Sequence, residues 1–109
     1  MSVLARVRMV APEDKRQEIV RTLRSLLEPT QVEPGCVTCH FYQDVQDENV
    51  LNYVEEWCSQ EDLERHLRSD QYRKLLAVID AAAEPPEIRF DTVSQTRGIE
   101  TIEAARHTE

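Results

Sequence analysis

Five side chains in the middle of the chain could carry acid–base chemistry beside an aromatic pocket. His66 could act as a general base, because an imidazole ordinarily titrates near neutral pH. Trp57, Tyr53 and Tyr72 could line an apolar pocket for a small ligand. Asn52 could hold a ligand oxygen through its amide, since a buried amide within a strand needs a partner. Each also has a structural alternative: core packing for the aromatic residues, a backbone hydrogen bond for the histidine, and solvent exposure for the amide.

The segment Cys36–His40 reads CVTCH and matches the attachment motif of c-type haem, C-x-x-C-H. In a strand, Cys36 and Cys39 would point to opposite faces, with their Cα atoms about 10 Å apart. That separation exceeds the limit of about 7 Å for a disulfide and keeps the thiols and His40 from meeting at one metal. Because no secretory leader is recognisable, we expect three free thiols in the reducing cytoplasm, with neither haem nor metal here.

The composition excludes several classes of function. With 109 residues, the chain can form one domain with a modest core. Its net charge of −8 argues against a nucleic-acid partner, which needs clustered lysines and arginines. Two glycines are too few for a typical phosphate-binding loop, and no apolar run approaches the roughly 18 residues of a membrane span.

The elements that must position these side chains follow from the hydrophobic periodicity. Residues 3–10 alternate apolar and polar and predict a strand. A helix with one apolar stripe should open near Pro12 and end at Pro29, because the residue before a proline is pushed out of the α region. Residues 36–43 and 50–58 are rich in β-formers and predict two strands joined by a polar hairpin loop.

The second half of the chain predicts helices and then a last strand. Ser59 is expected to cap one short helix, and Ser69 begins a second helical segment that stops at the prolines near residue 85. Residues 87–96 alternate and predict a fourth strand, so residues 1–96 should form one domain. The tail, residues 97–109, is expected to be a short helix, an arm that reaches a partner, or disordered.

The predicted order of elements is β-α-β-β-α-β, which is the ferredoxin-like arrangement of the α+β class. It places two helices on one face of an antiparallel four-stranded sheet. The third strand carries apolar residues on both faces, and this indicates that the second face is also covered. We therefore expect a homodimer that packs sheet to sheet.

Four motifs follow one another in an order and spacing that fit the predicted elements: LLEPT at residues 26–30, EPGC at 33–36, EEW at 55–57 and LERHLRSDQY at 63–72. Together they resemble the antibiotic biosynthesis monooxygenase family, over roughly residues 3–96. The resemblance implies a ferredoxin-like dimer whose two sheets form a barrel. Several members of the family are cofactor-free monooxygenases that oxidise quinols or polycyclic phenols with molecular oxygen.

On this resemblance, the expected substrates are a small aromatic quinol and O2, with no cofactor. His66 would be the base, the three aromatic residues would line the pocket, and Asn52 would be its polar anchor. Haem degradation is disfavoured, because the resemblance implies an Asn on the first strand, where Arg6 and Arg8 stand, and a Trp where His66 stands. The haem-ligating His would fall near Leu76.

Two further functions fit the same residues. One is a non-catalytic dimeric module that binds a small ligand or assists a stress response, and the other is an isomerase of a small carbonyl compound. A pocket filled by core side chains would favour the module, whereas an open apolar cavity with converging polar groups would favour an enzyme. An isomerase would turn over without consuming oxygen.

Overall fold

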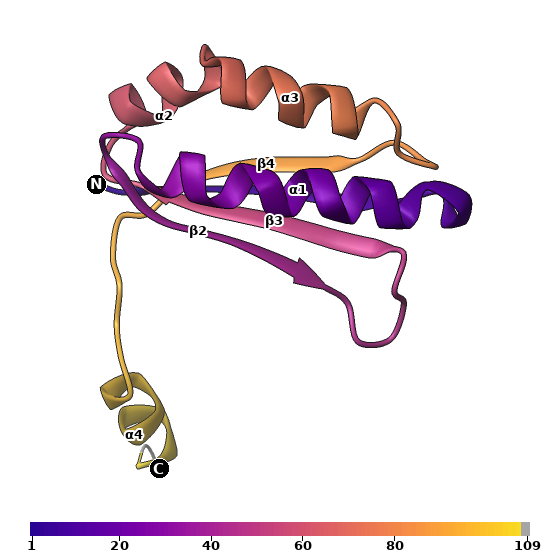
Figure 1. The fold of residues 1–109 in the computed structure, drawn as a ribbon. Coiled ribbons are helices and arrows are strands. Elements are labelled where there is room, and N and C mark those ends of the chain that lie inside the picture. The colour runs from indigo at the N-terminus through magenta and orange to yellow at the C-terminus, as the bar shows by residue number, and fades with distance from the viewer. Residues whose placement is uncertain (108–109) are drawn as a thin grey trace.

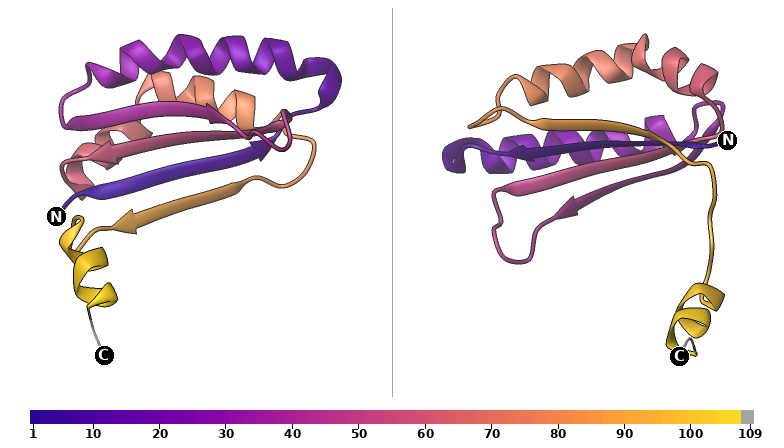
Figure 2. Two further views of the ribbon diagram at one scale, coloured as in Figure 1. Left: turned by 90° about the horizontal axis from the view of Figure 1, so that it is seen from below. Right: turned by 180° about the vertical axis from the view of Figure 1, so that it is seen from behind.

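The computed structural model describes residues 1–107 and has the α+β ferredoxin-like architecture (Figure 1). Its strands are β1 (Val3–Val10), β2 (Cys36–Gln43), β3 (Val50–Trp57) and β4 (Glu87–Thr92). Its helices are the 3-10 turn η1 (Glu13–Lys15), α1 (Arg16–Gln31), α2 (Gln60–Leu67), α3 (Asp70–Ile79) and α4 (Glu100–Arg106). The sheet is antiparallel, in the order β2-β3-β1-β4. Helices α1, α2 and α3 cover one of its faces (Figure 2).

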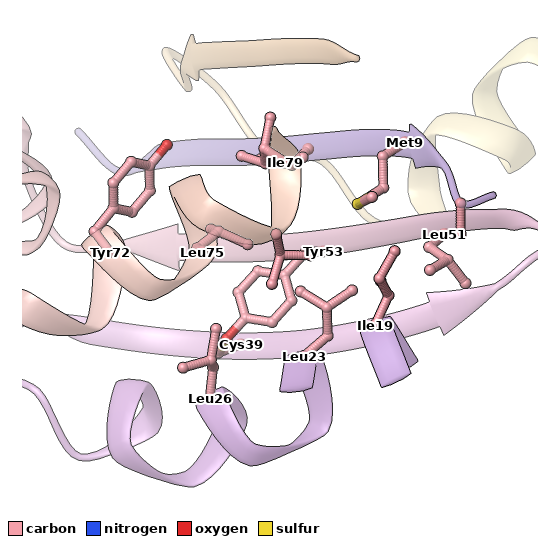
Figure 3. Close-up of a cluster of buried hydrophobic side chains, with 13 residues drawn as sticks. Met9, Ile19, Leu23, Leu26, Cys39, Leu51, Tyr53, Tyr72, Leu75 and Ile79 are labelled. Carbon is pink, nitrogen blue, oxygen red and sulfur yellow. The ribbon is translucent and has the colours of Figure 1, made fainter. Parts of the chain in front are cut away.

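The main core lies between the sheet and helices α1 and α3. It forms because β1 and β3 turn every second side chain toward the helices, while both helices offer one apolar stripe. Figure 3 shows this cluster, with Tyr72 at one end and Met9 and Leu51 at the other. A smaller cluster packs beside it, made of Val3, Ala5, Trp57 and Leu63.

Helix α1 differs from the expectation at both ends. Residues 13–15 form a separate 3-10 turn before the α-helix begins at Arg16. The prediction that Pro29 ends the helix is wrong, because the helix continues to Gln31. Pro29 lies in the last turn, where it removes one backbone donor, and the chain beyond it still bonds back, from Val32 N–H to Glu28 O at 3.3 Å.

A bulge in β2 overturns the predicted orientation of the first two cysteines. Cys36 pairs with Trp57 and Cys39 with Glu55, and the register shifts between Cys36 and Thr38. The extra residue resets the alternation, so both cysteines turn toward the helices instead of to opposite faces. His40 lies on the other side of the strand and is exposed.

The helix caps follow the prediction, and part of the tail forms a short helix, which is one of the three alternatives expected for residues 97–109; residues 108 and 109 lie outside the described part of the chain. The hydroxyls of Ser59 and Ser69 accept hydrogen bonds from the backbone N–H of the third residue of α2 and of α3, Asp62 and Tyr72. Strand β4 stops at Thr92 instead of residue 96. Helix α4 then stands away from the body of the protein, with Ile99 and Ile102 exposed (Figure 1). Within residues 1–107, no helix is long and apolar enough to cross a membrane.

Candidate functional site

His66, on α2, lies between two carboxylates. Its Nε2 is 2.9 Å from Glu55 Oε2, and its Nδ1 is 3.0 and 2.9 Å from the two oxygens of Glu33. Glu55 comes from the C-terminal part of β3 and Glu33 from the turn between α1 and β2. The side chains of His66 and Glu55 are only 2% and 3% exposed, whereas that of Glu33 is 20% exposed. Glu33 is therefore the member of this charged cluster that faces solvent.

Trp57 forms one wall of the cluster. Its indole stacks on the imidazole of His66, with ring centroids 4.5 Å apart, and its Nε1–H donates to Glu55 Oε1 at 3.1 Å. Both oxygens of Glu55 are thus used, one by the indole and one by the imidazole. Glu55 consequently fixes the orientation of His66 much as the carboxylate of a catalytic triad fixes its histidine.

The turn that carries Glu33 is held against α2. Arg65 donates to the carbonyl of Pro34 at 3.2 Å, and the amide of Cys58 donates to Gly35 O at 2.8 Å. Gly35 has a φ of 85° and packs directly on Asp62, so it leaves no room for a Cβ atom. The turn therefore meets α2 at Asp62, Arg65 and His66, which lie on one face of the helix because they are spaced three and four residues apart. This contact explains why the motifs at residues 33–36 and 63–72 occur together.

The surroundings of His66 favour its protonated, imidazolium form. Burial alone lowers its pKa, but the hydrogen bonds and charges of Glu55 and Glu33 outweigh that effect, and the net result is a pKa above the ordinary 6.5. Both ring nitrogens face carboxylate oxygens, and only the protonated ring can donate to both. One cation between two anions leaves the cluster with a net charge of −1.

The other aromatic residues lie at different depths. Tyr72 meets the ring of His66 edge-on at 5.4 Å, so it borders the cluster. Tyr53 lies deeper in the main core beside Cys39 and Thr30, and burial raises its pKa well above the usual range. Burial likewise raises the pKa of Cys39 to about 12, so its thiol stays protonated.

Asn52 does not join the site. It lies on the face of the sheet opposite the helices, because neighbouring residues of a strand point to opposite faces and Tyr53 points inward. The sequence prediction had Asn52 as the polar anchor beside His66, but the fold places the two residues on opposite sides of the sheet. Glu33 and Glu55 take the positions at His66 that the sequence prediction gave to no residue. Both belong to motifs noted in the sequence, Glu33 to EPGC and Glu55 to EEW, but neither motif indicates a contact with His66.

Side chains fill the space around the cluster. Trp57 is 0% exposed and stacks directly on His66, so a ligand reaches the imidazole only if a neighbouring side chain moves. The described residues also form a groove of about 350 Å³ between α1 and α3, but Lys15, Ile19, Lys74 and Val78 line it, away from His66. Among residues 1–107, no group of three or more His, Cys, Asp or Glu side chains is arranged so that it could hold a metal ion, and this includes the cluster around His66.

Relatives of this chain share the fold. A structure from Methanosarcina mazei matches with a TM-score of 0.77 and 25% identity, over 84% of this chain and 91% of that one. Rv0793 from Mycobacterium tuberculosis matches with a TM-score of 0.80 and 20% identity, over 90% of this chain and 100% of that one. A candidate antibiotic biosynthesis monooxygenase from Nitrosomonas europaea has a TM-score of 0.78 and 19% identity, over 89% and 94% of the two chains.

The sequence itself also has a family match. The protein sll1783 from Synechocystis is 27% identical over 77% of this chain, a region that spans only 58% of that relative. The family model described as "Antibiotic biosynthesis monooxygenase" matches residues 2–78, which include every member of the charged cluster. The chain belongs to the antibiotic biosynthesis monooxygenase family.

Proposed function

We propose that the protein is a cofactor-independent monooxygenase that oxidises a small quinol or polyphenol with molecular oxygen. The observation that supports this most is the buried cluster in which Glu55 orients His66 against Trp57. A buried histidine with a raised pKa and a carboxylate behind it is a device for taking up a proton. An aromatic wall beside it suits a flat phenolic ring.

The proposed chemistry begins with proton transfer. When Glu33 turns away, Nδ1 of neutral His66 can accept the proton of a phenolic hydroxyl, while Nε2–H still donates to Glu55. Glu55 then stabilises the imidazolium that forms. The resulting phenolate is more electron-rich than the phenol and therefore reduces oxygen more readily.

The overall reaction balances without another reductant. A quinol and O2 give a hydroxyquinone and water: one oxygen atom bonds to a ring carbon in place of hydrogen, and the other leaves as water. The quinol loses four electrons and O2 gains four. His66 takes the first proton and can return it to the reduced oxygen that departs as water.

A second candidate is a non-catalytic module that binds a small ligand. The observation that favours it is the packing of Trp57, Tyr53 and Tyr72, which are 0%, 3% and 7% exposed and form part of the core. An isomerase of a small carbonyl compound would use the same acid–base groups. Oxygen consumption separates the oxygenase from both alternatives.

The proposed assembly is a homodimer packed through the open face of the sheet. Helices cover only the opposite face (Figure 2), and the open face carries Leu4, which is 39% exposed, and the half-buried Val54. Cross-strand neighbours of these residues include Arg6, whose guanidinium bonds Glu87 at 3.2 Å. A mixed apolar and polar face of this kind suits a self-complementary contact.

An oxygen electrode tests the function directly. Hydroquinones of increasing ring size are added to the wild-type protein, to His66→Gln and to the control His107→Gln, whose histidine is exposed in the tail. We expect oxygen uptake by the wild type and the control, with a loss of about 100-fold in His66→Gln, as is typical for removal of a general base. Full activity in His66→Gln would refute the base, and no uptake with any quinol would refute the oxygenase.

A further inference from the structure

We infer that Glu33 occupies, in the unliganded protein, the position that the acidic oxygen of the substrate takes at Nδ1 of His66. The site would thus select compounds that present an anionic oxygen, phenolates first among them, and Glu33 would compete with them. The inference rests on the proposed function in that the ligand is taken to be an acidic phenol. It adds the ionic form in which the ligand is bound and the residue that competes with it.

Glu33 differs from Glu55 in its exposure to solvent and in its hydrogen-bond partners. Glu55 is 3% exposed, belongs to a central strand and bonds both His66 and Trp57, so it cannot leave without breaking two hydrogen bonds. Glu33 is 20% exposed, belongs to a turn and has His66 as the partner of both its oxygens. Of the two carboxylates that hold the imidazole, Glu33 is therefore the one that can be displaced.

Displacement requires only a side-chain rotation. The backbone of the turn is fixed to α2 through Arg65 and to the end of β3 through Cys58. The Glu33 amide also donates to Thr30 O at 3.1 Å. Because the backbone is anchored on both sides of Glu33, its side chain can rotate toward solvent while the turn stays in place, and such rotations are fast for partly exposed residues.

A phenolate matches Glu33 in charge and in hydrogen bonding. Glu33 shares one negative charge over the two oxygens that face Nδ1–H, and a phenolate would bring one negative charge on a single oxygen, so exchange keeps the net charge of −1 at the cluster. The ionisable groups near this position are Glu55 from β3, Tyr72 from α3 and Cys36 from β2. The ion pair of Arg65 and Asp62, from α2, lies against the next two residues of the turn. Burial raises the pKa of Cys36 to about 11, so near neutral pH its thiol is uncharged, as is the Tyr72 hydroxyl, whose pKa is also raised. A neutral alcohol would instead leave the imidazolium with a weaker partner.

The test is a binding titration with 4-nitrophenol, whose anion absorbs visible light and which is not a quinol. The wild type is compared with Glu33→Gln, Glu33→Ala and the control Glu61→Gln, which removes the same charge from an exposed position on α2. Titrations are run below the pKa of His66, measured in each variant from the NMR signal of its ring protons. Circular dichroism confirms that each variant is folded, and the Gln variant preserves the shape of the side chain.

We expect both Glu33 variants to bind 4-nitrophenolate at least about tenfold more tightly than the wild type. In the wild type Glu33 fills the site most of the time, and the apparent affinity is reduced in proportion to the small fraction of time for which the site is free. The control should bind as the wild type does, and 4-nitrobenzyl alcohol should not compete. Equal affinity in all four proteins, a gain equal to that of Glu61→Gln, or no binding at all would overturn the inference. Oxygen uptake is scored separately, so tighter binding without uptake would refute only the oxygenase, and uptake without tighter binding would refute only the role of Glu33.

Discussion

Replacement of Glu55 by Gln is expected to reverse the effect of pH on the stability of the protein. In the wild type, Glu55 accepts hydrogen bonds from the indole of Trp57 and from the imidazolium of His66. A glutamine can accept from only one of them, and its NH2 group must face the other. The indole nitrogen cannot become an acceptor, but the imidazole can, by losing the proton on Nε2. The substitution therefore favours neutral His66 and lowers its pKa.

The sign of the pH effect follows from the pKa of His66. In the wild type this pKa is raised above 6.5, so the stabilisation from His66 is fully present below about pH 6.5 and is lost as pH rises through the folded-state pKa. In Glu55→Gln the folded-state pKa is lowered instead, and stability then falls as pH decreases. Breaking a buried ion pair costs about 3 kcal/mol or more, which we expect near pH 5.5. The cost should shrink toward about pH 8.5, where neutral His66 satisfies the glutamine.

The assay is urea denaturation at both pH values, followed by circular dichroism. Fluorescence is avoided because Trp57 contacts residue 55, so the substitution itself would change the emission. The control is Glu56→Gln, which changes the neighbouring residue on the opposite face of the sheet. We expect the control to stay within about 0.5 kcal/mol of the wild type. A loss in Glu55→Gln that is equal at the two pH values, or no larger than in the control, would refute the ion pair with His66.

Three other predictions follow from the fold. Gly35→Ala should lower the free energy of unfolding by about 1–3 kcal/mol in a thermal or urea denaturation, because residue 35 has a positive φ; an unchanged stability would contradict the tight turn. Cys58 is exposed and should react with Ellman's reagent well before Cys36 and Cys39, whose pKa values are raised to about 11 and about 12, with all three reacting in urea; equal rates in the folded protein would contradict their burial. Val54→Asp should turn the proposed dimer into a folded monomer in light scattering, whereas a monomeric wild type would contradict the sheet-to-sheet contact.

Most of the fold could be predicted from the sequence because its signals are local. The alternation in residues 3–10 and 50–57 and the serine caps each depend on side chains close in sequence. The two errors have different causes, one local and one that depends on a distant strand. Pro29 stays within α1 because later residues still bond back into the helix, and the bulge in β2 depends on its pairing with β3.

The candidate site could be predicted only in part. Periodicity placed Trp57 and Tyr53 on one face of β3, which the structure shows to be the inner face, and the same period of two separates Asn52 from them. The partners of His66 could not be predicted, because Glu33 and His66 are 33 positions apart and meet only when the turn packs on α2. A single acidic residue in a turn has no sequence feature that identifies its partner.

The most direct test of the account compares two titrations of one histidine. The pKa of His66 is measured from its ring-proton NMR signal, and the pH dependence of quinol-dependent oxygen uptake is measured on the same protein. If His66 is the base, uptake should rise with pH through a pKa above 6.5 that equals the NMR value, and both transitions should move to lower pH in Glu55→Gln. Oxygen uptake that does not follow the titration of His66, or that persists in full in His66→Gln, would contradict the account.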